Sequence, residues 1–207
     1  MAKLTELSCE EFLEKLASAA PTPGGGGGAA MAGALAASLS SMVANLTIGK
    51  KGFEANEAKI KELLAQAEQL RAELVDLVQQ DAGVFDSFMA CYKLPKATDA
   101  EKQARLDAIH AAAKGAAMVP MNIARAASKV LVIADELSVI GNSNVITDAT
   151  CSAILARAAL RCAVYNVYIN LKLETSVYKL LLIHNEKARK AAVGAADAAA
   201  LAVGLAC

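Results

Sequence analysis

A carboxylate stands where a long predicted helix should carry a core side chain. Apolar residues recur at seven-residue steps at Ile60, Ala67, Leu74 and Phe88, and Asp81 occupies the one step in this series that is not apolar. Residues seven apart share a helix face, so Asp81 is predicted to point into the core. A buried charge is costly unless it is paired, and carboxylates with altered pKa values cluster at functional sites. Asp81 is therefore the first candidate for proton transfer, with a structural ion pair as the alternative.

A second acid, Asp148, lies in the first turn of a predicted helix of small residues. An acid there stabilises the helix dipole by about 0.3–1 kcal/mol without any further role. The same helix carries Ser152, Asn166 and Asn170 on roughly one face, and buried amides need hydrogen-bond partners. This polar seam indicates either a binding site or a hydrogen-bond network between helices.

An earlier helix of small residues has its own polar stripe, Ser38, Ser41 and Asn45, and it ends near Lys50 and Lys51. Lysines at a helix C-terminus usually compensate the dipole or face solvent. Beside buried carboxylates, either lysine could instead serve in catalysis.

Five glycines, Gly24 to Gly28, follow Pro21-Thr22-Pro23 and lead into this earlier helix. No Gly-Lys-Ser/Thr follows and no strand pattern precedes them, so a phosphate-binding loop is not predicted. Glycines still allow close backbone approach at a helix N-terminus, whose free N–H groups favour an anion or a polar heterocycle.

The elements that must position these residues are predicted to be helices throughout. The 207-residue chain carries 21 acidic and 21 basic side chains, so no basic field favours nucleic acid. Alanine is abundant, proline is scarce and only 4% of residues are aromatic, which predicts an all-α fold. We expect a single multi-helix bundle of long up-and-down helices, two of them buried and built of small residues. The bundle should span residues 1–190, and residues 191–207 should form an Ala-rich C-terminal tail or last helix.

Capping and periodicity set the expected helix boundaries. Ser8 and Glu11 form a capping box. Pro120 should kink or divide the helix that contains it. Gly141 to Asn144 should form a turn. The predicted helices run from Ser8 to before Pro21, from Gly28 to about Ile48, from Glu54 to Tyr92, from Thr98 or Asp99 to about Ile140, from Val145 to Leu171, and from Glu174 to Lys190.

Composition also bears on location and metals. Ala29–Ile48 is long and uncharged enough to cross a bilayer, but it is built of Ala, Gly and Ser with Asn45 and Thr47 inside it. We interpret it as a helix buried all round in a bundle, and expect no membrane association. No secretory signal is recognisable, so the expected location is cytoplasmic. Neither histidine is expected to bind a metal.

The cysteines form no zinc or redox motif, since they are scattered along the chain and odd in number. They are expected to be small core residues. They are Cys9, Cys91, Cys151, Cys162 and Cys207.

Several motifs in order resemble one protein family, the cyclodeaminase/cyclohydrolase family. It contains the C-terminal domain of formiminotransferase-cyclodeaminase and stand-alone methenyltetrahydrofolate cyclohydrolases. The resemblance extends from about Leu4 to Lys190. Its motifs are Pro21-Thr22-Pro23-Gly24-Gly25-Gly26, Leu46-Thr47-Ile48-Gly49-Lys50-Lys51, Asp81 with Phe85, Lys93-Leu94-Pro95-Lys96, Gly141-Asn142 with Asn144, and Asn166-Val167-Tyr168-Ile169-Asn170-Leu171.

The resemblance implies an all-helical homodimer that acts on a tetrahydrofolate derivative, with a glutamate tail of one or several residues and without a metal or redox cofactor. In cyclodeamination, N10 of 5-formiminotetrahydrofolate attacks the formimino carbon and ammonia leaves. In the cyclohydrolase reaction, water attacks the same carbon of 5,10-methenyltetrahydrofolate and the ring opens. Both reactions need a proton acceptor for the nucleophile and a donor for the leaving nitrogen.

The resemblance and the pattern-breaking residues together suggest a site. Asp81 and Asp148 would flank the reacting carbon, and Lys50 would act as the acid, or Lys50 or Lys51 would steer the substrate's carboxylates. The substrate-binding candidates are Thr22, Pro23, Gly24, Gly25, Gly26, Ser41, Asn45, Lys51, Phe85, Asn142, Asn144, Asn166 and Asn170.

Three alternatives stay open at this stage. A slight preference goes to cyclodeaminase over cyclohydrolase. A non-catalytic helical interaction module predicts no folate binding. A membrane-associated bundle predicts dependence on detergent, and the charged residues between Glu54 and Gln80 disfavour it.

Overall fold

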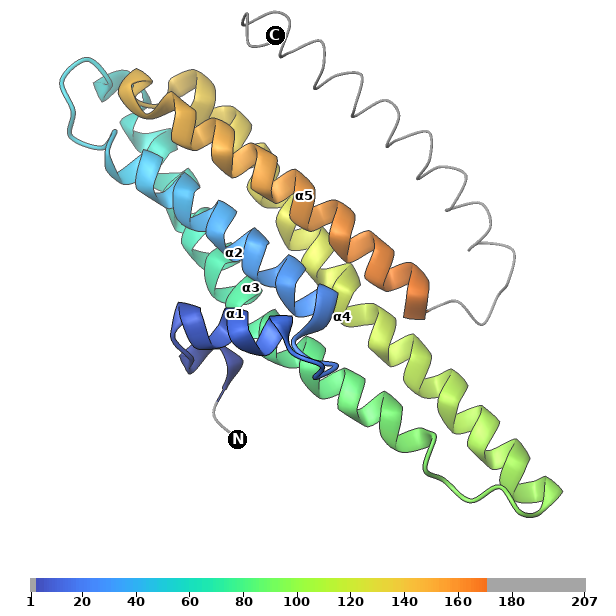
Figure 1. The fold of residues 1–207 in the computed structure, drawn as a ribbon. Coiled ribbons are helices and arrows are strands. Elements are labelled where there is room, and N and C mark those ends of the chain that lie inside the picture. Colours follow the sequence, from blue (N-terminus) through green and yellow to red (C-terminus); the bar gives the residue numbers. More distant parts are fainter. Residues whose placement is uncertain (1–2, 171–207) are drawn as a thin grey trace, which may run out of the picture. The chain divides into compact units, whose positions relative to one another are not determined.

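Four long helices run up and down beside one another, with a short helix beside the N-terminal end of α2 (Figure 1). The computed structural model describes residues 3–170, and this part of the chain contains no strand. Around the bundle, α2 neighbours α3 and α5, and α4 neighbours α3 and α5. The elements are η1 (Leu4–Glu6), α1 (Cys9–Ala17), α2 (Gly24–Asn45), η2 (Glu54–Asn56), α3 (Glu57–Cys91), α4 (Asp99–Ile140), η3 (Ser143–Val145) and α5 (Ile146–Asn170). The all-α prediction is confirmed; the predicted helix from Glu174 to Lys190 and the tail lie outside the described residues.

Local capping sets two helix starts as the sequence predicts. The Ser8 hydroxyl accepts a hydrogen bond from the Glu11 N–H at 3.2 Å, and the Glu11 carboxylate accepts one from the Ser8 N–H at 2.8 Å. Thr98 and Glu101 form the same reciprocal pair at the start of α4. Each pair satisfies amides that the first helical turn leaves free.

Pro120 does not divide α4, contrary to one of the two predicted outcomes. The helix continues from Asp99 to Ile140 with Pro120 buried inside it. Proline has no N–H for the carbonyl four residues earlier, which is that of Ala116. The Asn170 side chain donates to this freed carbonyl at 2.9 Å, so a neighbouring helix satisfies it.

The contact between α2 and α5 depends on small side chains. A Cβ added at Gly33 would lie 3.0 Å from the Leu74 side chain and 3.6 Å from Ala159, so only glycine fits without displacement. The hydroxyls of Ser40 and Ser152 lie 2.8 Å apart, and Ser152 also donates to the Ala36 carbonyl at 2.7 Å. Close backbone approach therefore joins the two small-residue helices.

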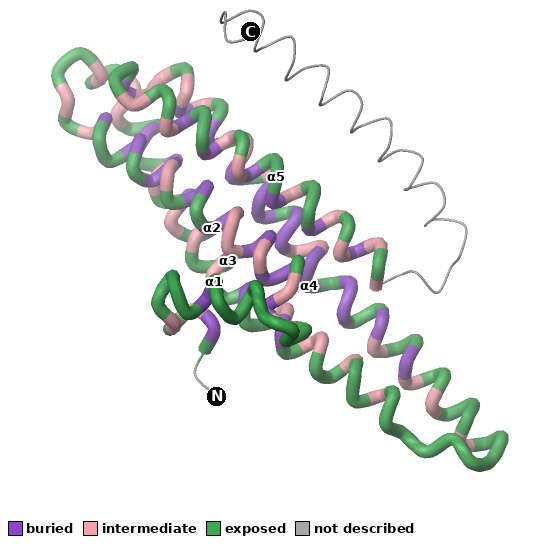
Figure 2. The backbone as a smooth tube through the Cα atoms, viewed as in Figure 1, coloured by how far each residue is buried: buried purple, intermediate pink, exposed green. Residues whose placement is uncertain are grey.

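The outer faces of α2 and α5 correct two predictions (Figure 2). The first small-residue helix is not buried all round in one copy of the chain, since Leu35 is 54% and Met42 is 42% exposed. The cysteines are not core residues: Cys9, Cys151 and Cys162 are exposed and Cys91 is half-buried. Small apolar residues on an uncharged outer face look like core residues in a sequence. Cys207 lies outside the described part.

Helices α2 and α4 are long and apolar enough to cross a membrane by length and composition alone. Of their most apolar stretches, 61% in α2 and 56% in α4 is buried inside the structure. Core helices of a bundle have the same composition, which makes this weak support for a membrane span.

Hydrogen bonds among Thr47, Asn142 and Asn144, which we call the polar latch, hold the end of the bundle where α2 ends and α5 begins. The Thr47 hydroxyl is buried; it donates to the Val43 carbonyl at 2.7 Å and accepts from the Asn142 N–H at 3.0 Å. The Asn142 side chain donates to the Leu46 carbonyl at 3.0 Å and accepts from the Asn144 N–H at 3.1 Å. The predicted turn is thus held against the end of α2.

Replacing Thr47 with Val should lower the free energy of unfolding by about 1–3 kcal/mol, because the buried Asn142 N–H loses its acceptor. Urea unfolding measures the change. The matched control is Thr150→Val on the exposed side of α5, where the change should stay within about 0.5 kcal/mol. Equal effects at both sites would show that the latch adds nothing.

Candidate functional site

A pocket of about 330 Å³ lies at the N-terminus of α2, where this end approaches α3, α4 and α5. Its volume is at the lower limit for small-molecule sites. It is lined by Pro21, Thr22, Pro23, Gly24, Gly25, Gly26, Asp81, Val84, Phe85, Phe88, Ala116, Asn166, Ile169 and Asn170. Nine of the predicted site residues are among them: Thr22, Pro23, Gly24, Gly25, Gly26, Asp81, Phe85, Asn166 and Asn170.

Asp81 is the carboxylate of this pocket. It projects from α3 and is half-buried, and this burial raises its pKa above the usual carboxyl range. The backbone amide of Gly27 opposes the shift by stabilising the charged form, although its helical hydrogen bond goes to the Pro23 carbonyl at 3.1 Å. A carboxyl group with a raised pKa is better matched to proton transfer near neutral pH than an ordinary aspartate.

Gly26 makes room for the Asp81 carboxylate. A Cβ added at Gly26 would fall on both carboxylate oxygens, well inside van der Waals contact. At Gly25 an added Cβ would lie 3.5 Å from the Asn166 side chain, which is an ordinary contact. The prediction was that these glycines leave room for a ligand. At Gly26 it is wrong, because the missing side chain leaves room for the Asp81 carboxylate instead.

The two predicted amides both reach the pocket from α5. Asn166 donates to the Cys162 carbonyl at 2.8 Å within its own helix, and Asn170 donates to the Ala116 carbonyl of α4. Ser152, predicted to share their face, is bonded to α2 and lies away from the pocket. The polar seam is therefore partly a hydrogen-bond network between helices and partly pocket lining.

Other predicted site residues lie at the opposite end of the bundle. Helices α2 and α5 are antiparallel (Figure 1), so the C-terminus of α2 meets the N-terminus of α5. Asp148 lies eighteen residues before Asn166, about 27 Å along α5 at 1.5 Å per residue. The hypothesis that Asp81 and Asp148 flank one carbon is therefore not met within one copy of the chain. The other predicted residues that do not line the pocket are Ser41, Asn45, Lys50, Lys51, Asn142 and Asn144.

One of these distant residues has a structural partner, since Asn142 belongs to the latch with Thr47. Ser41 is buried, and its hydroxyl makes no hydrogen bond within the described residues, although it lies near enough to Glu68 to help Arg71 hold the pKa of Glu68 below the usual range.

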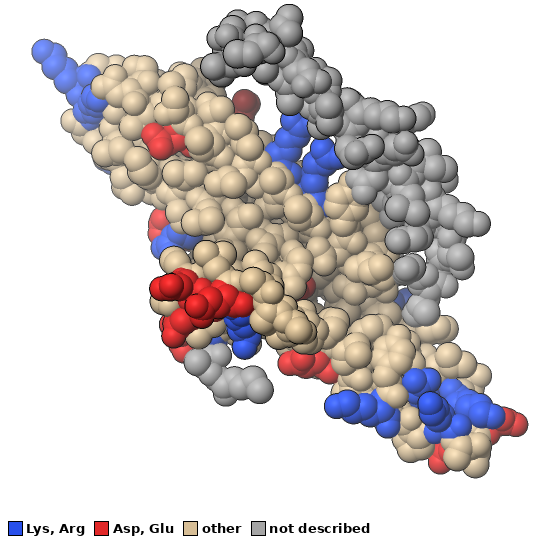
Figure 3. Space-filling model, viewed as in Figure 1, with Lys and Arg blue, Asp and Glu red and all other residues tan. Residues whose placement is uncertain are grey.

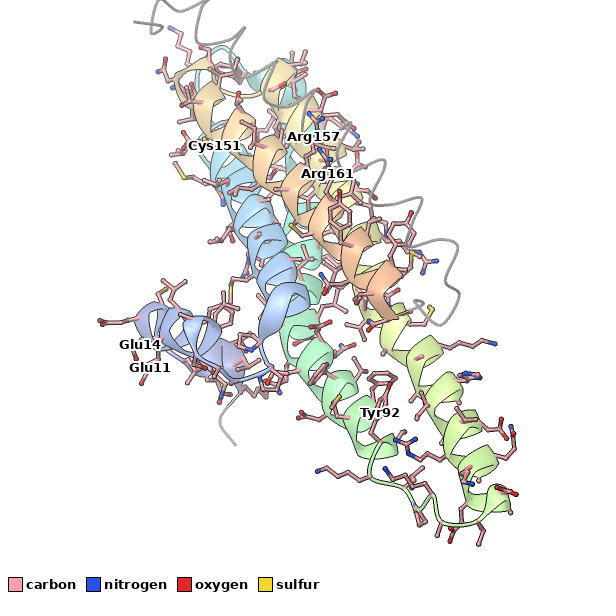
Figure 4. The ribbon with its side chains drawn as sticks, turned by 45° about the vertical axis from the view of Figure 1, so that its right-hand side comes forward. Glu11, Glu14, Tyr92, Cys151, Arg157 and Arg161 are labelled. Carbon is pink, nitrogen blue, oxygen red and sulfur yellow. The ribbon has the colours of Figure 1, made fainter. Side chains whose placement is uncertain are left out.

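The pocket also contains four apolar residues that are not among the predicted site residues: Val84, Phe88, Ala116 and Ile169. Val84 and Phe88 follow the helical spacing of apolar residues, and this spacing does not distinguish a residue that packs in the core from one that lines a pocket. Beyond Phe88, the Tyr92 ring packs edge-on with a centroid distance of 5.4 Å, and Arg105 lies 5.4 Å above that ring (Figure 4). An aromatic wall thus leads from the pocket toward the tip of the α3–α4 hairpin.

A second hollow, of about 410 Å³, lies between α3 and α4 and is lined mainly by Gln, Glu and Lys side chains. Its Glu136 pairs with Lys59 at 3.4 Å, and both side chains are more than a third exposed. None of the predicted site residues lines it. Within residues 3–170, no group of three His, Cys, Asp or Glu residues is arranged to hold a metal ion.

Known proteins that are similar in sequence and fold identify the family of this chain. The family model of formiminotransferase-cyclodeaminase matches residues 8–177. The chain belongs to this family. The resemblance inferred from the sequence motifs is thereby confirmed, and the chain is an enzyme of the folate-related cyclodeaminase/cyclohydrolase family.

Three members of the family show how far the similarity extends. The chain is 48% identical over 163 residues to a methenyltetrahydrofolate cyclohydrolase of Methylorubrum extorquens, covering 79% of the chain and 78% of that protein. It is 31% identical over 169 residues to the rat formimidoyltransferase-cyclodeaminase, of which it spans only 31%. The crystal structure of a formiminotetrahydrofolate cyclodeaminase from Thermotoga maritima matches with a TM-score of 0.73 at 33% identity, covering 89% of each chain.

The raised pKa of Asp81 predicts a pH-dependent effect on stability. The Asp81 carboxyl group binds its proton more tightly in the folded protein than in the unfolded chain. The free energy of unfolding therefore falls as the pH rises from the ordinary carboxyl pKa of about 4 through the higher pKa of Asp81 in the folded protein. We expect Asp81→Asn to melt at a higher temperature than the wild type at pH 7, with the difference vanishing toward pH 4. Scanning calorimetry across this range measures it. A lower melting temperature at pH 7 would mean that the charged form is structurally paired.

The contact between Gly26 and Asp81 gives a second test. Gly26→Ala should displace the carboxylate and lower stability, although alanine is the better helix former by about 1 kcal/mol. At Gly28, also in α2, an added Cβ meets nothing within 4 Å, so Gly28→Ala should be neutral or stabilising. Thermal unfolding of both variants measures the difference, and equal stabilisation would refute the proposed role of Gly26.

Proposed function

We propose that this enzyme is a methenyltetrahydrofolate cyclohydrolase, which adds water to 5,10-methenyltetrahydrofolate and releases 10-formyltetrahydrofolate. The half-buried Asp81 in a pocket at a helix N-terminus carries the proposal. The 48% identity to a cyclohydrolase over most of both chains supports it over cyclodeamination, so the preference from sequence is reversed. Cyclodeamination of 5-formiminotetrahydrofolate is the second candidate, supported by the Thermotoga maritima structure.

Asp81 has the properties that the water-addition step needs. The substrate carries a positive amidinium-like carbon between N5 and N10, and a nearby carboxylate stabilises that charge. As the water oxygen bonds to this carbon, one water proton passes to the carboxylate. The carboxyl group then returns a proton to N5 as the bond from N5 to the carbon breaks. The second water proton goes to solvent as the formyl C=O forms on N10, so one proton is released overall.

The rest of the pocket suits the ring system of the substrate. Phe85 and Phe88 offer flat apolar walls, while Thr22 and the amides of Asn166 and Asn170 offer hydrogen-bonding groups. A volume of about 330 Å³ accommodates the fused rings rather than a whole folate. The aminobenzoyl and glutamate parts would therefore extend out of the pocket.

Two further parts of the proposal come from the family resemblance. The first is a glutamate tail of one or several residues, which would follow the aromatic wall toward Arg105 and the lysines of the hairpin tip, Lys93 and Lys96. Supporting this, Lys and Arg side chains gather at that tip (Figure 3). The second is assembly as a homodimer in the cytoplasm, and exposed apolar residues on α2 and α5 are compatible with such an assembly.

The test uses the absorbance band of methenyltetrahydrofolate. Purified protein should accelerate loss of the band from 5,10-methenyltetrahydrofolate above the spontaneous rate. Asp81→Asn should reduce this rate by about 10²–10⁴-fold, the usual contribution of a general acid or base, while circular dichroism stays unchanged. The matched control is Asp86→Asn, an exposed acid on α3 outside the pocket, which should retain full activity.

Other outcomes would redirect the assignment. A rise of the band from 5-formiminotetrahydrofolate alone would establish cyclodeamination instead. Full activity of Asp81→Asn would remove Asp81 from the chemistry. If the absorbance band changes with neither substrate, and calorimetry detects no folate binding, the protein would instead be a non-catalytic interaction module.

A further inference from the structure

A proline lies in the interior of α4, where a helix is least able to accommodate one. Pro120 is fully buried, and the helix continues on both sides of it, from Asp99 to Ile140. Proline is the least favourable residue in a helix interior, because it has no N–H and its ring crowds the carbonyl four residues earlier. Pro120 therefore either fills space in the core or serves the carbonyl that it leaves free, which is that of Ala116.

The carbonyl that Pro120 leaves free lies at the pocket. Ala116 is one of the residues that line the pocket, whereas Pro120 is not. The Asn170 side chain donates to the Ala116 carbonyl at 2.9 Å across the contact between α4 and α5. In a regular helix this carbonyl would accept from the N–H four residues later. Pro120 thus gives Asn170 an acceptor that a regular helix would use internally.

This hydrogen bond determines which end of the Asn170 amide faces the pocket. A carbonyl can only accept, so the amide nitrogen must be the end that is turned toward Ala116. The amide oxygen lies on the other side of the same planar group, and within residues 3–170 it accepts no hydrogen bond. Since Asn170 lines the pocket, its oxygen is available to a ligand.

The second amide of the pocket is oriented in the same sense. Asn166 donates from its nitrogen to the Cys162 carbonyl at 2.8 Å, and its oxygen accepts no hydrogen bond from the described part of the chain. Together with the Asp81 carboxylate, the two amides line the pocket with acceptor oxygens. Acceptors grouped in this way favour a ligand that carries N–H groups along one edge. The aminopyrimidine ring of the proposed substrate has such an edge.

We propose that Pro120 is a positioning residue for substrate recognition. By freeing the Ala116 carbonyl it fixes the Asn170 amide, whose oxygen then accepts a hydrogen bond from an N–H group of the substrate's aminopyrimidine ring. The inference rests on the proposed function and adds to it how the ring, rather than the reacting carbon, is recognised. An amide that is already fixed loses less conformational freedom on binding than a mobile one, so it binds more tightly.

Replacing Pro120 with Ala tests the role of the missing N–H. Alanine supplies an N–H that competes with Asn170 for the Ala116 carbonyl. Calorimetry with tetrahydrofolate, which lacks the one-carbon unit and cannot react, should show a Kd raised about three- to tenfold, the usual effect of one weakened hydrogen bond. The KM for 5,10-methenyltetrahydrofolate should rise equally while kcat changes less than about twofold, because ring binding is lost equally from the ground state and the transition state.

Thermal unfolding separates this role from a structural one. The melting temperature of Pro120→Ala should stay the same or rise, because the regained helical hydrogen bond offsets the lost packing of the ring. Pro120→Val restores the same N–H with a volume closer to that of the proline ring, and it should weaken tetrahydrofolate binding to the same extent. Weaker binding with alanine but not with valine would indicate a cavity as the cause and would overturn the inference.

A double-mutant cycle tests whether Pro120 acts through Asn170. Asn170→Ala should weaken tetrahydrofolate binding at least as much as Pro120→Ala does. Adding Pro120→Ala to Asn170→Ala should then change the Kd by less than about twofold, since the amide that Pro120 positions is already gone. Additive effects of the two substitutions would mean that Pro120 affects the pocket by another route, which would overturn the inference.

Gly115→Ala is the matched control on the same helix. Gly115 does not line the pocket, and a Cβ added there meets nothing within 4 Å. Alanine at this position also improves α4 as a helix, but it provides no new donor for the Ala116 carbonyl. The variant should keep the wild-type Kd for tetrahydrofolate. An equal loss of affinity in Gly115→Ala would attribute the effect to the stability of α4 and overturn the role of Pro120.

Nuclear magnetic resonance gives a direct readout of the positioned amide. In the free protein, the side-chain amide proton that Asn170 donates should exchange more slowly in the wild type than in Pro120→Ala, and its signal is identified by its absence from Asn170→Ala. Equal exchange in both proteins would overturn the inference.

Failure of the inference and failure of the proposed function give different results. Turnover of 5,10-methenyltetrahydrofolate by the wild type, with an unchanged Kd for tetrahydrofolate in Pro120→Ala, would refute the inference alone. A wild-type protein that binds tetrahydrofolate but does not turn over 5,10-methenyltetrahydrofolate would refute the proposed function, and the comparison of Kd values would still decide the role of Pro120.

Discussion

The close approach of α2 to α3 and α5 is the constraint on which the rest of the structure depends. Gly33 fits against Leu74 and Ala159 because it has no side chain, and Ser40 and Ser152 join the two helices through their hydroxyls. With the helix axes this close, the N-terminus of α2 lies directly against α3 at Asp81. The pocket is the space left where five glycines start a helix beside a carboxylate, and it exists only because that helix can come so near.

Asp81 is held by two opposing effects whose balance suits its proposed role. Burial disfavours its charge, while the amide end of α2 favours it, and burial prevails because the pKa is raised. Gly26 permits this position, since any side chain there would occupy the space of the carboxylate. A cationic substrate would place an opposite charge beside this carboxylate and favour its ionised form. The pKa of Asp81 would therefore be lower in the complex than in the free protein, so that the carboxylate is charged when it accepts the water proton.

Features that depend on contacts within one helix could be predicted from the sequence, whereas features that depend on which helices meet in space could not. The capping boxes at Ser8 and Thr98 and the inward position of Asp81 follow from spacing within one helix, and all were predictable. The location of Asp148 was not, because periodicity assigns a residue to a face of its helix but does not say which end of that helix meets which neighbour. Phe88 was missed for a related reason, since a pocket wall and a core contact have the same spacing. Cys151 and Cys162 were misassigned because an uncharged outer face has the composition of a core.

The prediction that α2 is buried all round fails in one copy of the chain, yet its physical basis remains sound. Over 22 residues the helix has no charged side chain, while Leu35, Met42 and Leu46 face outward. A helix face that stays in water is ordinarily marked by charged residues, as on the outer side of α3, where Lys59, Lys61 and Glu62 are exposed. The homodimer proposed above would cover these outward residues, because a face without charges is suited to contact with another protein surface. Composition therefore identifies a helix face that avoids water, but it does not tell whether the covering surface comes from the same chain or from another copy.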